Sequence, residues 1–493
     1  PATGETHSGN GPFRTFRVET QAATIAAAPV ASGRTALVPG FFAAMHAAHQ
    51  RFGRLPWAGL LAPAIWLCDH GVPVGDALAG MVMNRREVLQ RLPETREVFF
   101  SGGADAWSAG GWFRQPALGH TLRKVAEQGA AYIYEGEWAD AFVRQVQAEG
   151  GRVSLEDLAT YRAIESRPLR ASIYGHELRT VPAPDNGGAT LAEGLKLLEA
   201  MRIGDPLAGG EDLYWMTQIL HQTSGHALFG NEERVSEAHV ARVAAAMRAA
   251  GGAVAPSRLL AGSHSDYVVT ADADGMMVSV CHSINTALWG ATGINVGGIS
   301  IPDAASFQQQ ALALVKPGDF LPNPMNPSIL YKDGRPLLAC SSIGSGLMSV
   351  SLQYLHSMLA LGLDVQAAVQ RPRLHGSNLQ GGDSVISGAG FSGGRTLSLT
   401  ERIAQLMQKA RSMAGDPRDL TTQLMLLLPL CIEMEADAAV VDAARARGAL
   451  LDRMEVSDHA MARGYWGGIQ RDAASGRLRG GRTPGASGQI VAV

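Results

Sequence analysis

The stretch LLAGSHSDYVVTADADGMMVSVCHSIN, residues 259–285, contains two alternating segments separated by a turn. Apolar and polar residues alternate on both sides of Asp274-Gly275, a dipeptide typical of a tight turn between antiparallel strands. Serines and histidines lie near both ends of this predicted hairpin: Ser263, His264, Ser265, His282 and Ser283. The stretch therefore predicts either an ordinary hairpin with a polar, solvent-facing side or a site where a hydroxyl is held for nucleophilic attack.

The composition of the 493 residues is typical of a globular protein with a large core, because 46% are apolar and 18% are charged. The formal net charge of −3 predicts no strong attraction to nucleic acid or to an anionic membrane. The longest apolar run, 424–432, is too short to span a bilayer and contains Pro429. Four widely separated cysteines predict neither a disulfide framework nor a zinc site: Cys68, Cys281, Cys340 and Cys431. We therefore expect no metal, no cofactor, no nucleic-acid partner and no membrane span.

Helical periodicity is clearest in the first half of the chain. Apolar residues at helical spacing predict helices within 40–70, where Pro56 and Pro63 should each begin a helix and Gly71 should end the last one. Further helices are expected at 119–150, 189–201, 212–250 and 154–162, where Ser154 followed by Asp157 predicts a capping box at the start of the helix. A β-hairpin is expected at 170–181, paired strands in the alternating residues 265–301, and a second hairpin at 328–340 that turns on Lys332-Asp333-Gly334. A helix at 346–360 and two edge strands in the last 30 residues complete the pattern, which predicts a layered α/β (α+β) fold with an antiparallel core.

Ten short segments along the chain resemble the γ-glutamyltranspeptidase family, whose members are N-terminal-nucleophile (Ntn) hydrolases. In the first half they are VPGF (38–41), RFGRLPWAGLLAPAI (51–65), YEGEWA (134–139), DLATYRAIESRPL (157–169) and PAPDNGG (182–188). In the second half they are DADG (272–275), SIN (283–285), PMNPSI (324–329), SSIGSG (341–346) and RPRLH (371–375). No single segment is specific, but ten in the right order are. The resemblance, which runs from about Arg17 to about 375 and resumes near 455, implies a four-layer αββα sandwich with two stacked, mainly antiparallel sheets.

This sequence departs from the family in three ways. The family's opening Gly-rich and Ala-rich helix is absent from it, residues 385–455 resemble an insertion, and serine must replace the catalytic threonine. The resemblance implies two parts of one Ntn-hydrolase domain. Residues 1–264 are expected to be a mostly helical, N-terminally truncated part similar to the large subunit. Residues 265–493 are expected to be similar to the small subunit, carrying the nucleophile and a helical insertion at 385–455.

In this family, the chain cuts itself, and the residue after the cut becomes both N-terminus and nucleophile. A hydroxyl is a poor nucleophile at its own pKa, and the free α-amine of the same residue, with a pKa of about 7.7–8.0, supplies the base. Serine keeps the hydroxyl of threonine but lacks the methyl group that restricts its rotamer. The resemblance therefore implies that an acyl-enzyme forms on a serine.

Two serines are alternatives for the nucleophile. Counting back from the turn places the family's nucleophile on Ser265 without a gap, its supporting hydroxyl on Ser283 and its substrate-binding asparagine on Asn285. A hairpin centred on Asp274 would also place residue 265 opposite 283.

Ser263 is the second alternative. It follows Gly262, a small residue that is easily strained for self-cleavage, but this choice requires two extra residues in the outgoing strand. The sequence leaves both serines open.

The resemblance assigns the oxyanion hole to the backbone N–H groups of Gly344 and Ser345, at the start of a predicted helix. The alternative is a plain helix-capping turn. The family's carboxylate-binding serines correspond to Asn323 and Pro324, of which only Asn323 can donate a hydrogen bond.

Both charged anchors of a glutamyl group are displaced. The family's arginine position reads Glu19, and Arg17, on the same face of a strand, is the residue available to substitute. The family's aspartate position reads Ile301, and Asp303 lies two residues further on. Because losing a buried charge partner changes the preferred ligand, we expect an acyl group other than plain γ-glutamyl.

Two other interpretations of the hairpin are weaker. A Ser-His pair is disfavoured because His264 and His282 point to the face of the strand opposite their serine neighbours, so we expect structural or gating roles. Asp272 and Asp274 are expected to form the turn rather than to bind calcium.

The leading hypothesis is a self-processing amidohydrolase or acyltransferase of the γ-glutamyltransferase and hydrolase type. It would transfer γ-glutamyl or a related acyl group, such as the glutaryl and adipyl groups of the related cephalosporin acylases, from a small-molecule amide to water or an amine. Cleavage would yield a heterodimer of large and small subunits, or a dimer of such heterodimers. The alternatives are a non-catalytic, uncleaved homologue that acts as a scaffold or binding protein, and a family member repurposed in secondary metabolism.

Overall fold

The computed structural model describes residues 7–10, 32–102, 107, 110–225, 232–254, 265–284, 289–304, 315–344, 346–375, 430–433, 435–454, 464–484 and 489–491. The chain forms two compact units. The sheet unit comprises Pro1–Ser8, Arg167–Cys281 and Pro322–Val493, and the helical unit comprises Gly9–Ser166 and His282–Leu321. This division reflects packing alone, and the subunit boundary between 264 and 265, which depends on cleavage, stays a prediction.

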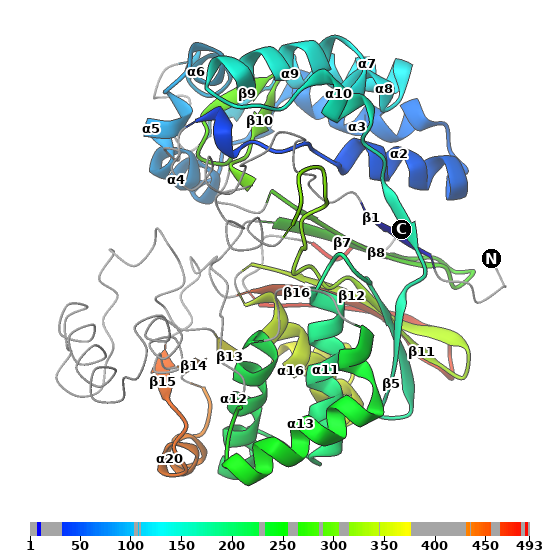
Figure 1. Cartoon of the computed structure of the whole chain (residues 1–493), viewed down its shortest axis with the longest axis vertical. Coiled ribbons are helices and arrows are strands. Elements are labelled where there is room, and N and C mark those ends of the chain that lie inside the picture. Colours follow the sequence, from blue (N-terminus) through cyan, green and yellow to red (C-terminus); the bar gives the residue numbers. More distant parts are fainter. Residues whose placement is uncertain are drawn as a thin grey trace. The chain divides into compact units, whose positions relative to one another are not determined.

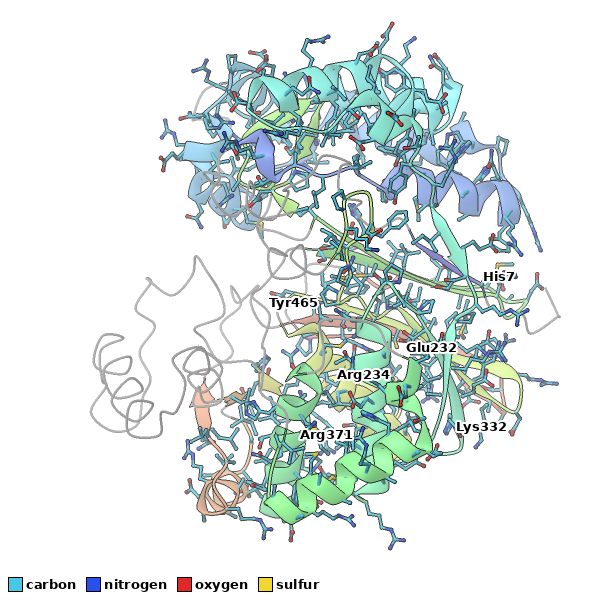
Figure 2. All side chains as sticks on the ribbon, in the orientation of Figure 1. His7, Glu232, Arg234, Lys332, Arg371 and Tyr465 are labelled. Atoms are coloured by element: carbon cyan, nitrogen blue, oxygen red, sulfur yellow. The ribbon has the colours of Figure 1, made fainter. Side chains whose placement is uncertain are left out.

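A six-stranded sheet forms the centre of the sheet unit (Figure 1). Its strands in spatial order are β17 (Leu478–Arg482), β16 (Tyr465–Arg471), β12 (Arg335–Ile343), β11 (Ser328–Lys332), β6 (His176–Thr180) and β5 (Leu169–Ile173). All neighbouring pairs are antiparallel. The hairpins predicted at 170–181 and 328–340 are thereby confirmed. Their tips are joined where Lys332, labelled in Figure 2, donates from Nζ to Gly175 O at 2.9 Å.

Only one of the two C-terminal strands is an edge strand. β17 lies at the edge, but β16 pairs on both sides, so the prediction of two edge strands was wrong for β16. The reason is long-range pairing, because β12 pairs with β16 on the side opposite β17. A Cβ at Gly467 would lie 2.4 Å from the ring of Tyr267, and a Cβ at Gly468 would lie 2.4 Å from the ring of Trp466. These glycines let large side chains lie flat on the strand.

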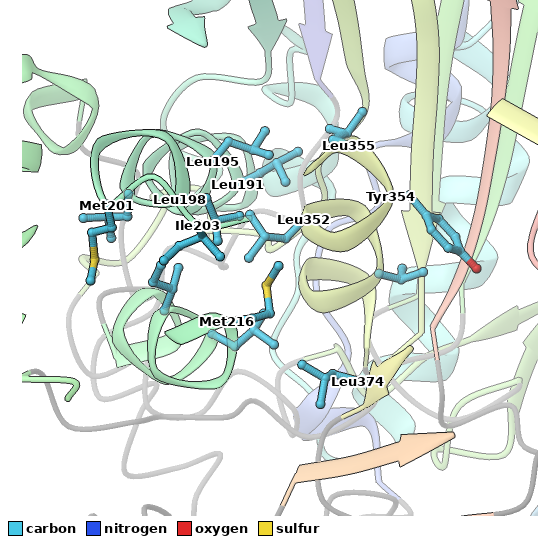
Figure 3. Packing of buried hydrophobic residues seen from close by; sticks show 14 of the residues in the cluster. Leu191, Leu195, Leu198, Met201, Ile203, Met216, Leu352, Tyr354, Leu355 and Leu374 are labelled. Carbon is cyan, nitrogen blue, oxygen red and sulfur yellow. The ribbon is translucent and has the colours of Figure 1, made fainter. Parts of the chain in front are cut away.

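Helices pack against one face of this sheet and against each other. They are α11 (Gly187–Ala200), α12 (Gly210–Gly225), η3 (a 3-10 helix, Glu232–Val235), α13 (Glu237–Ala250), α16 (Leu347–Leu359) and α17 (Val365–Val369). Leu191, Leu195 and Leu198 recur at helical spacing on α11 and face Leu352 and Leu355 of α16 in the main core (Figure 3). Burying each such leucine contributes about 1.5–3 kcal/mol. The helices predicted at 189–201 and 346–360 are confirmed. Of the helical stretch predicted at 212–250, α12 and α13 confirm the two ends, η3 is a 3-10 helix between them, and residues 226–231 lie outside the described residues.

The predicted hairpin of residues 265–283 is present as a separate two-stranded sheet, β7 (Ser265–Ala271) and β8 (Met277–Ser283). β7 packs against β12 and β16. Trp466 stacks edge-on with Tyr354 of α16, whereas the next residue, Gly467, faces Tyr267 of β7. Because consecutive strand residues point to opposite faces, the hairpin lies on the side of the sheet away from α16. The sheet unit therefore contains three of the four expected layers: helices, the six-stranded sheet and the hairpin.

A small sheet borders α16. Its strands are β13 (Leu374–His375), β14 (Leu430–Glu433) and β15 (Leu451–Met454), with α20 (Ala438–Ala446) between the last two. β13 and β14 are antiparallel, and β14 and β15 are parallel. The insertion predicted at 385–455 lies outside the described residues up to 429, and from 430 onward it contains strands as well as a helix.

The helical unit contains nine α-helices within the described residues. They are α2 (Phe41–Phe52), α3 (Trp57–His70), α4 (Asp76–Asn84), α5 (Arg86–Leu89), α6 (Pro93–Phe100), α7 (Pro116–Gln128), α8 (Ala131–Tyr134), α9 (Glu137–Ala148) and α10 (Leu155–Ala159), preceded by the 3-10 helix η1 (Gly33–Thr35). Short strands pair as β1 (Ser8–Asn10) with β4 (Ile164–Ser166), β2 (Val72–Pro73) with β3 (Trp112–Phe113), and β9 (Ile294–Val296) with β10 (Ile299–Ile301).

Two predicted helix boundaries of this unit are confirmed by their capping residues, and a third predicted boundary, at Pro63, is wrong. Ser154 and Asp157 form the predicted capping box at the start of α10. Gly71 ends α3 with φ +90°, as predicted. Pro63, however, lies inside α3 instead of beginning a helix, so that prediction was wrong. A helix packed against a neighbour, here α7, can continue past the one hydrogen bond that a proline removes.

Candidate functional site

Ser265 lies on the inner face of its hairpin. Along β7, the exposed residues alternate with partly buried ones, and Ser265 belongs to the partly buried set together with Tyr267. The Tyr267 ring contacts the backbone of Gly467. Ser265 therefore shares the face that packs on the six-stranded sheet, and the interpretation of a solvent-facing serine does not hold for it. Ser263 lies outside the described residues.

The second strand of the hairpin runs beside β12 in the same direction. Ser279 Oγ donates to Cys340 O at 2.7 Å, and two residues further on Cys281 Sγ lies 3.7 Å from Ser342 O. Burial raises the pKa of the Cys281 thiol to about 12, so the thiol stays protonated. Ser283 is the next residue of this alternating set, at the end of β8.

The position of Ser265 along the length of β12 follows from the contact between Tyr267 and Gly467. Gly467, which Tyr267 covers, pairs with Ser341 of β12. The chain reverses between β7 and β8 at a turn where the N–H of Asp272 donates to Met276 O at 3.0 Å. Because β8 runs in the same direction as β12, β7 runs antiparallel to β12. Ser265, two residues before Tyr267, is thereby directed toward the end of β12 that leads into Gly344. The equal lengths of β7 and β8 are what the predicted pairing of 265 with 283 requires, and that pairing stays a prediction.

Gly344 begins a buried turn that leads into α16. Its φ is +83°, in the left-handed region that favours glycine. Leu347 N donates to Gly344 O at 3.2 Å, and Gly346 is the N-cap of the helix without a side-chain cap. The positive end of the α16 dipole therefore lies at this turn. Ser345, the second predicted oxyanion-hole residue, lies outside the described residues.

A buried polar network fixes this turn from the helix side. The Ser342 hydroxyl lies 2.7 Å from both Asn326 Oδ1 and Leu347 O, and it accepts a hydrogen bond of 2.8 Å from Ser351 Oγ. Asn326, Ser342 and Ser351 are each at most 1% exposed. Fully satisfied buried networks hold backbone in one geometry. Sequence reasoning missed these three residues, and the only signal was the position of two of them inside the segments PMNPSI and SSIGSG.

The loop that contains Asn323 packs against the Gly-rich loop at 182–188. Asn186 N donates to Asn323 O at 3.0 Å, and a Cβ at Gly187 would lie 2.1 Å from the carbonyl oxygens of residues 324 and 325. Asn323 Oδ1 accepts from Met325 N at 3.3 Å. Within the described part of the chain, no hydrogen bond uses Nδ2 of Asn323, which leaves the donor that the prediction requires.

Asp185 is a second residue that sequence reasoning missed. It is 3% exposed, and burial raises its pKa well above the usual range of a carboxyl group. It is near enough to Cys281 for its charge to raise the pKa of that thiol. Its position in PAPDNGG, just before the two glycines, was the available signal.

The predicted site residues of the helical unit are only partly described. Asp303 is 3% exposed, and its Oδ1 accepts from Ala291 N at 2.8 Å, so this oxygen holds the neighbouring backbone. The His282 ring lies 4.6 Å from the ring of Phe41. Arg17 and Asn285 lie outside the described residues. Asp272 Oδ1 accepts from Met276 N at 2.8 Å, which confirms its predicted role in the turn.

A cavity of about 410 Å³ opens at the far end of β11 from the 322–327 loop. It is lined by Arg170, Ala171, Ser172, Gly175, His176, Glu177, Arg179, Tyr331, Asp333 and Gly334. The Arg179 guanidinium stacks on Tyr331 at 3.7 Å and pairs with Glu177. Three of the charged lining residues, Arg170, Glu177 and Arg179, are thus paired with one another, and the cavity is not part of the site around Gly344.

Neither a metal centre nor a membrane span is found in the part of the chain that the structure describes. No three His, Cys, Asp or Glu side chains are grouped there to hold a metal ion. None of its helices has the length and apolar character that crossing a bilayer requires.

Known proteins resemble this chain along most of its length. The model of the family described as gamma-glutamyltranspeptidase matches residues 13–416. The glutathione hydrolase proenzyme of Pseudomonas aeruginosa is 27% identical over 371 residues, which cover 69% of this chain and 66% of that protein. The acylase ACY 1 proenzyme of Pseudomonas sp. strain V22 is 27% identical over 364 residues, 70% of this chain and 65% of that protein. The chain thus spans just under two thirds of the length of these two relatives.

A solved structure confirms the fold. The cephalosporin acylase from Bacillus halodurans superposes with a TM-score of 0.75 at 20% sequence identity, covering 100% of this chain and 85% of that chain. The Ntn-hydrolase sandwich predicted from the sequence is therefore the fold of this protein. Because the family model matches most of the residues, the chain belongs to the gamma-glutamyltranspeptidase family.

Proposed function

We propose that this chain is a self-processing Ntn amidohydrolase or acyltransferase that acts through a serine. The observation that carries the proposal is the placement of Ser265 on the inner face of the hairpin, directed toward the turn at Gly344. Two relatives are named as proenzymes, one a glutathione hydrolase and one an acylase, which supports both a maturation step and the cleavage of an amide.

Maturation requires one internal bond to break. The hydroxyl of Ser265, or of Ser263, attacks the carbonyl carbon of the preceding residue, and the peptide bond becomes an ester on the serine oxygen. Water then hydrolyses the ester. The products are a carboxylate at the end of the first part and a serine with a free α-amine at the start of the second part.

Turnover uses the new α-amine as the base. It accepts the hydroxyl proton while the serine oxygen attacks the substrate amide, and the oxyanion that forms accepts hydrogen bonds from the N–H groups of Gly344 and Ser345. The amine product leaves with the proton, and water or a second amine then attacks the acyl-enzyme ester. The network of Asn326 and Ser342 supports this role, because fixed donors need no reorganisation when charge develops.

The substrate class follows from the anchors. Asp303 already uses one carboxylate oxygen on Ala291, whereas the Nδ2 of Asn323 remains as a donor. An amide whose acyl group ends in an acceptor such as a carboxylate fits the Asn323 donor, and the engaged oxygen of Asp303 supports an acyl group without the α-amine of a glutamyl group. We therefore propose a glutaryl-like or adipyl-like amide over plain γ-glutamyl.

A non-catalytic binding role is the second candidate. The observation that favours it is the same engagement of Asp303 with the backbone of Ala291, since one of the two carboxylate oxygens is then used to hold the fold. An uncleaved chain that binds an amide without turning it over would support this alternative.

Acyl-enzyme trapping tests the proposal. The purified chain is incubated with γ-glutamyl, glutaryl and adipyl p-nitroanilides, quenched in acid and weighed by mass spectrometry. We expect an acyl adduct on the fragment that begins with the nucleophile. The adduct should be absent from whichever of the two variants, S265A or S263A, replaces the nucleophile. S279A is the matched control, because Ser279 lies on the same hairpin face but bonds to Cys340 O. Correctly folded and cleaved protein that hydrolyses no amide in the panel would overturn the proposal.

A further inference from the structure

Arg373, His375 and Glu433 form a buried cluster where β13 pairs with β14. Oε1 of Glu433 accepts from Arg373 Nη2 at 3.0 Å, from Arg373 Nε at 3.1 Å and from His375 Nε2 at 2.9 Å. Oε2 accepts from the backbone N–H of Arg373 at 3.1 Å. All three residues are less than 10% exposed. The carboxylate therefore holds the guanidinium fork through two charge-assisted hydrogen bonds to one oxygen, a strong type of protein hydrogen bond.

The third guanidinium nitrogen of Arg373, Nη1, points toward the backbone next to the proposed oxyanion hole. Arg373 Nη1 donates to Gly464 O at 3.1 Å. Gly464 has φ +76°, and a Cβ there would lie 2.6 Å from the carbonyl carbon of Gly346. The two backbones are thus in direct contact. Gly346 is the N-cap of α16 and belongs to the turn 344–347, so only Gly464 separates the cluster from this turn.

Strand β13 also contacts the middle of α16. Leu374 N donates to Gln353 Oε1 at 2.7 Å, and Gln353 Nε2 donates to Leu374 O at 2.9 Å. The Arg373 guanidinium lies 5.9 Å from the ring centroid of Tyr354. Three contacts on the helix and one on Gly464 therefore fix the helix axis and its N-terminal turn together.

We propose that Glu433 is a positioning residue that sets the oxyanion-hole turn 344–347 through Arg373 and Gly464. The inference rests on the proposed function, because that turn acts only if an oxyanion forms there. Without the Glu433 charge, a buried guanidinium loses its partner and shifts toward water. Gly464 O then loses its donor, and Gly346 loses the fixed backbone that packs against it. Donor displacements of less than 1 Å are enough to slow an acyl transfer.

A second cluster with the same residue types provides a matched control. Glu193 accepts from Arg234 Nε at 3.0 Å and from His239 Nε2 at 2.6 Å (Arg234 is labelled in Figure 2). Arg234 and Glu193 are 5% and 0% exposed. This cluster joins α11, η3 and α13 instead of β13, β14 and Gly464. Its loss should destabilise the fold in the same way without acting on the turn.

The test compares E433Q with E193Q in the full chain, using the amide that the wild type turns over best. We expect E433Q to lower kcat about 10- to 100-fold with KM within twofold of the wild type, because the displaced donors act on the transition state. E193Q should lower Tm to a similar extent and keep the wild-type kcat. R373K, which keeps the charge but not the fork, should lower kcat by an intermediate factor and provides a second variant if E433Q does not fold.

The outcomes separate the two proposals. Wild-type turnover with equal kcat for E433Q, R373K and E193Q at matched folded fraction would overturn the positioning role and leave the proposed function standing. A loss confined to KM would overturn it as well. A cleaved, folded wild type without turnover would overturn both.

Discussion

The ring of Tyr267 rests on the backbone of Gly467, so closely that a Cβ at position 467 would lie 2.4 Å from Tyr267 Cε2. Gly467 pairs with Ser341 of β12, and Tyr267 lies two residues after Ser265 on β7. This contact therefore joins the hairpin of the proposed nucleophile to the strand that ends at Gly344. Burial raises the pKa of Tyr267 to about 12, so the ring remains neutral in this contact.

A methyl group at position 467 should displace the hairpin. We expect G467A to lower the free energy of unfolding by about 1–3 kcal/mol through overpacking and to slow self-cleavage. Y267A removes the atoms that the new methyl group meets, so the double variant G467A/Y267A should lose less than the sum of the two single variants. Urea unfolding and the rate of fragment appearance on a denaturing gel measure both effects. Strictly additive losses would contradict the contact.

Removing Asn326 should weaken the turn 344–347. In N326A, the Ser342 hydroxyl loses one of its two acceptors and Leu347 O loses a 3.4 Å hydrogen bond. We expect about 1–3 kcal/mol of lost stability and a kcat lowered more than KM is raised. S328A is the control, because Ser328 Oγ bonds to the backbone oxygen of Asn326 and not to the turn. A kcat loss of the same size in S328A would argue against a specific role of the side chain.

The buried carboxyl of Asp185 predicts a loss of stability with rising pH. Burial raises its pKa in the folded state above the unfolded value of about 3.9, so its neutral form contributes fully below that value. The contribution is lost as pH rises toward the folded pKa. D185N, which copies the neutral form, should flatten the pH dependence and be more stable than the wild type at neutral pH. Urea unfolding from pH 4 to pH 8 tests this, and parallel curves for both proteins would refute it.

Buried His221 predicts that stability falls as pH decreases, which is opposite to the effect of Asp185 and occurs in a different pH range. Burial lowers its pKa to about 4, against about 6.5 in the unfolded chain. Between these values the unfolded state binds a proton that the folded state excludes, so stability falls by up to about 3 kcal/mol as pH drops from 6.5 to 4. H221Q should remove most of this slope, as measured by Tm against pH. A wild-type slope retained in H221Q would assign the effect to other groups.

Local sequence patterns predicted much of the sheet unit and of the capping. Two turns and one capping box could be predicted because each depends on residues that are neighbours in sequence. They are the turns at Asp274-Gly275 and Lys332-Asp333-Gly334 and the capping box that begins at Ser154. The edge position of β16 and the continuation of α3 past Pro63 were wrong, since tertiary packing decides both.

The site shows the same limit. The hairpin and the turn at Gly344 could be predicted from segments, whereas the network of Asn326, Ser342 and Ser351 could not, because three separate elements meet to form it. The role of Asp303 in holding Ala291 was equally invisible, since a carboxylate that binds a ligand and one that holds backbone have the same sequence pattern.

The intact mass of the purified full chain under denaturing conditions tests the central claim most directly. Self-processing predicts two fragments, of which the second begins at Ser265 or Ser263, and the measured masses identify the nucleophile. Replacing that serine by alanine should leave the chain whole. A folded wild-type protein that stays a single species of 51.9 kDa would contradict self-processing and leave the uncleaved binding protein as the better account.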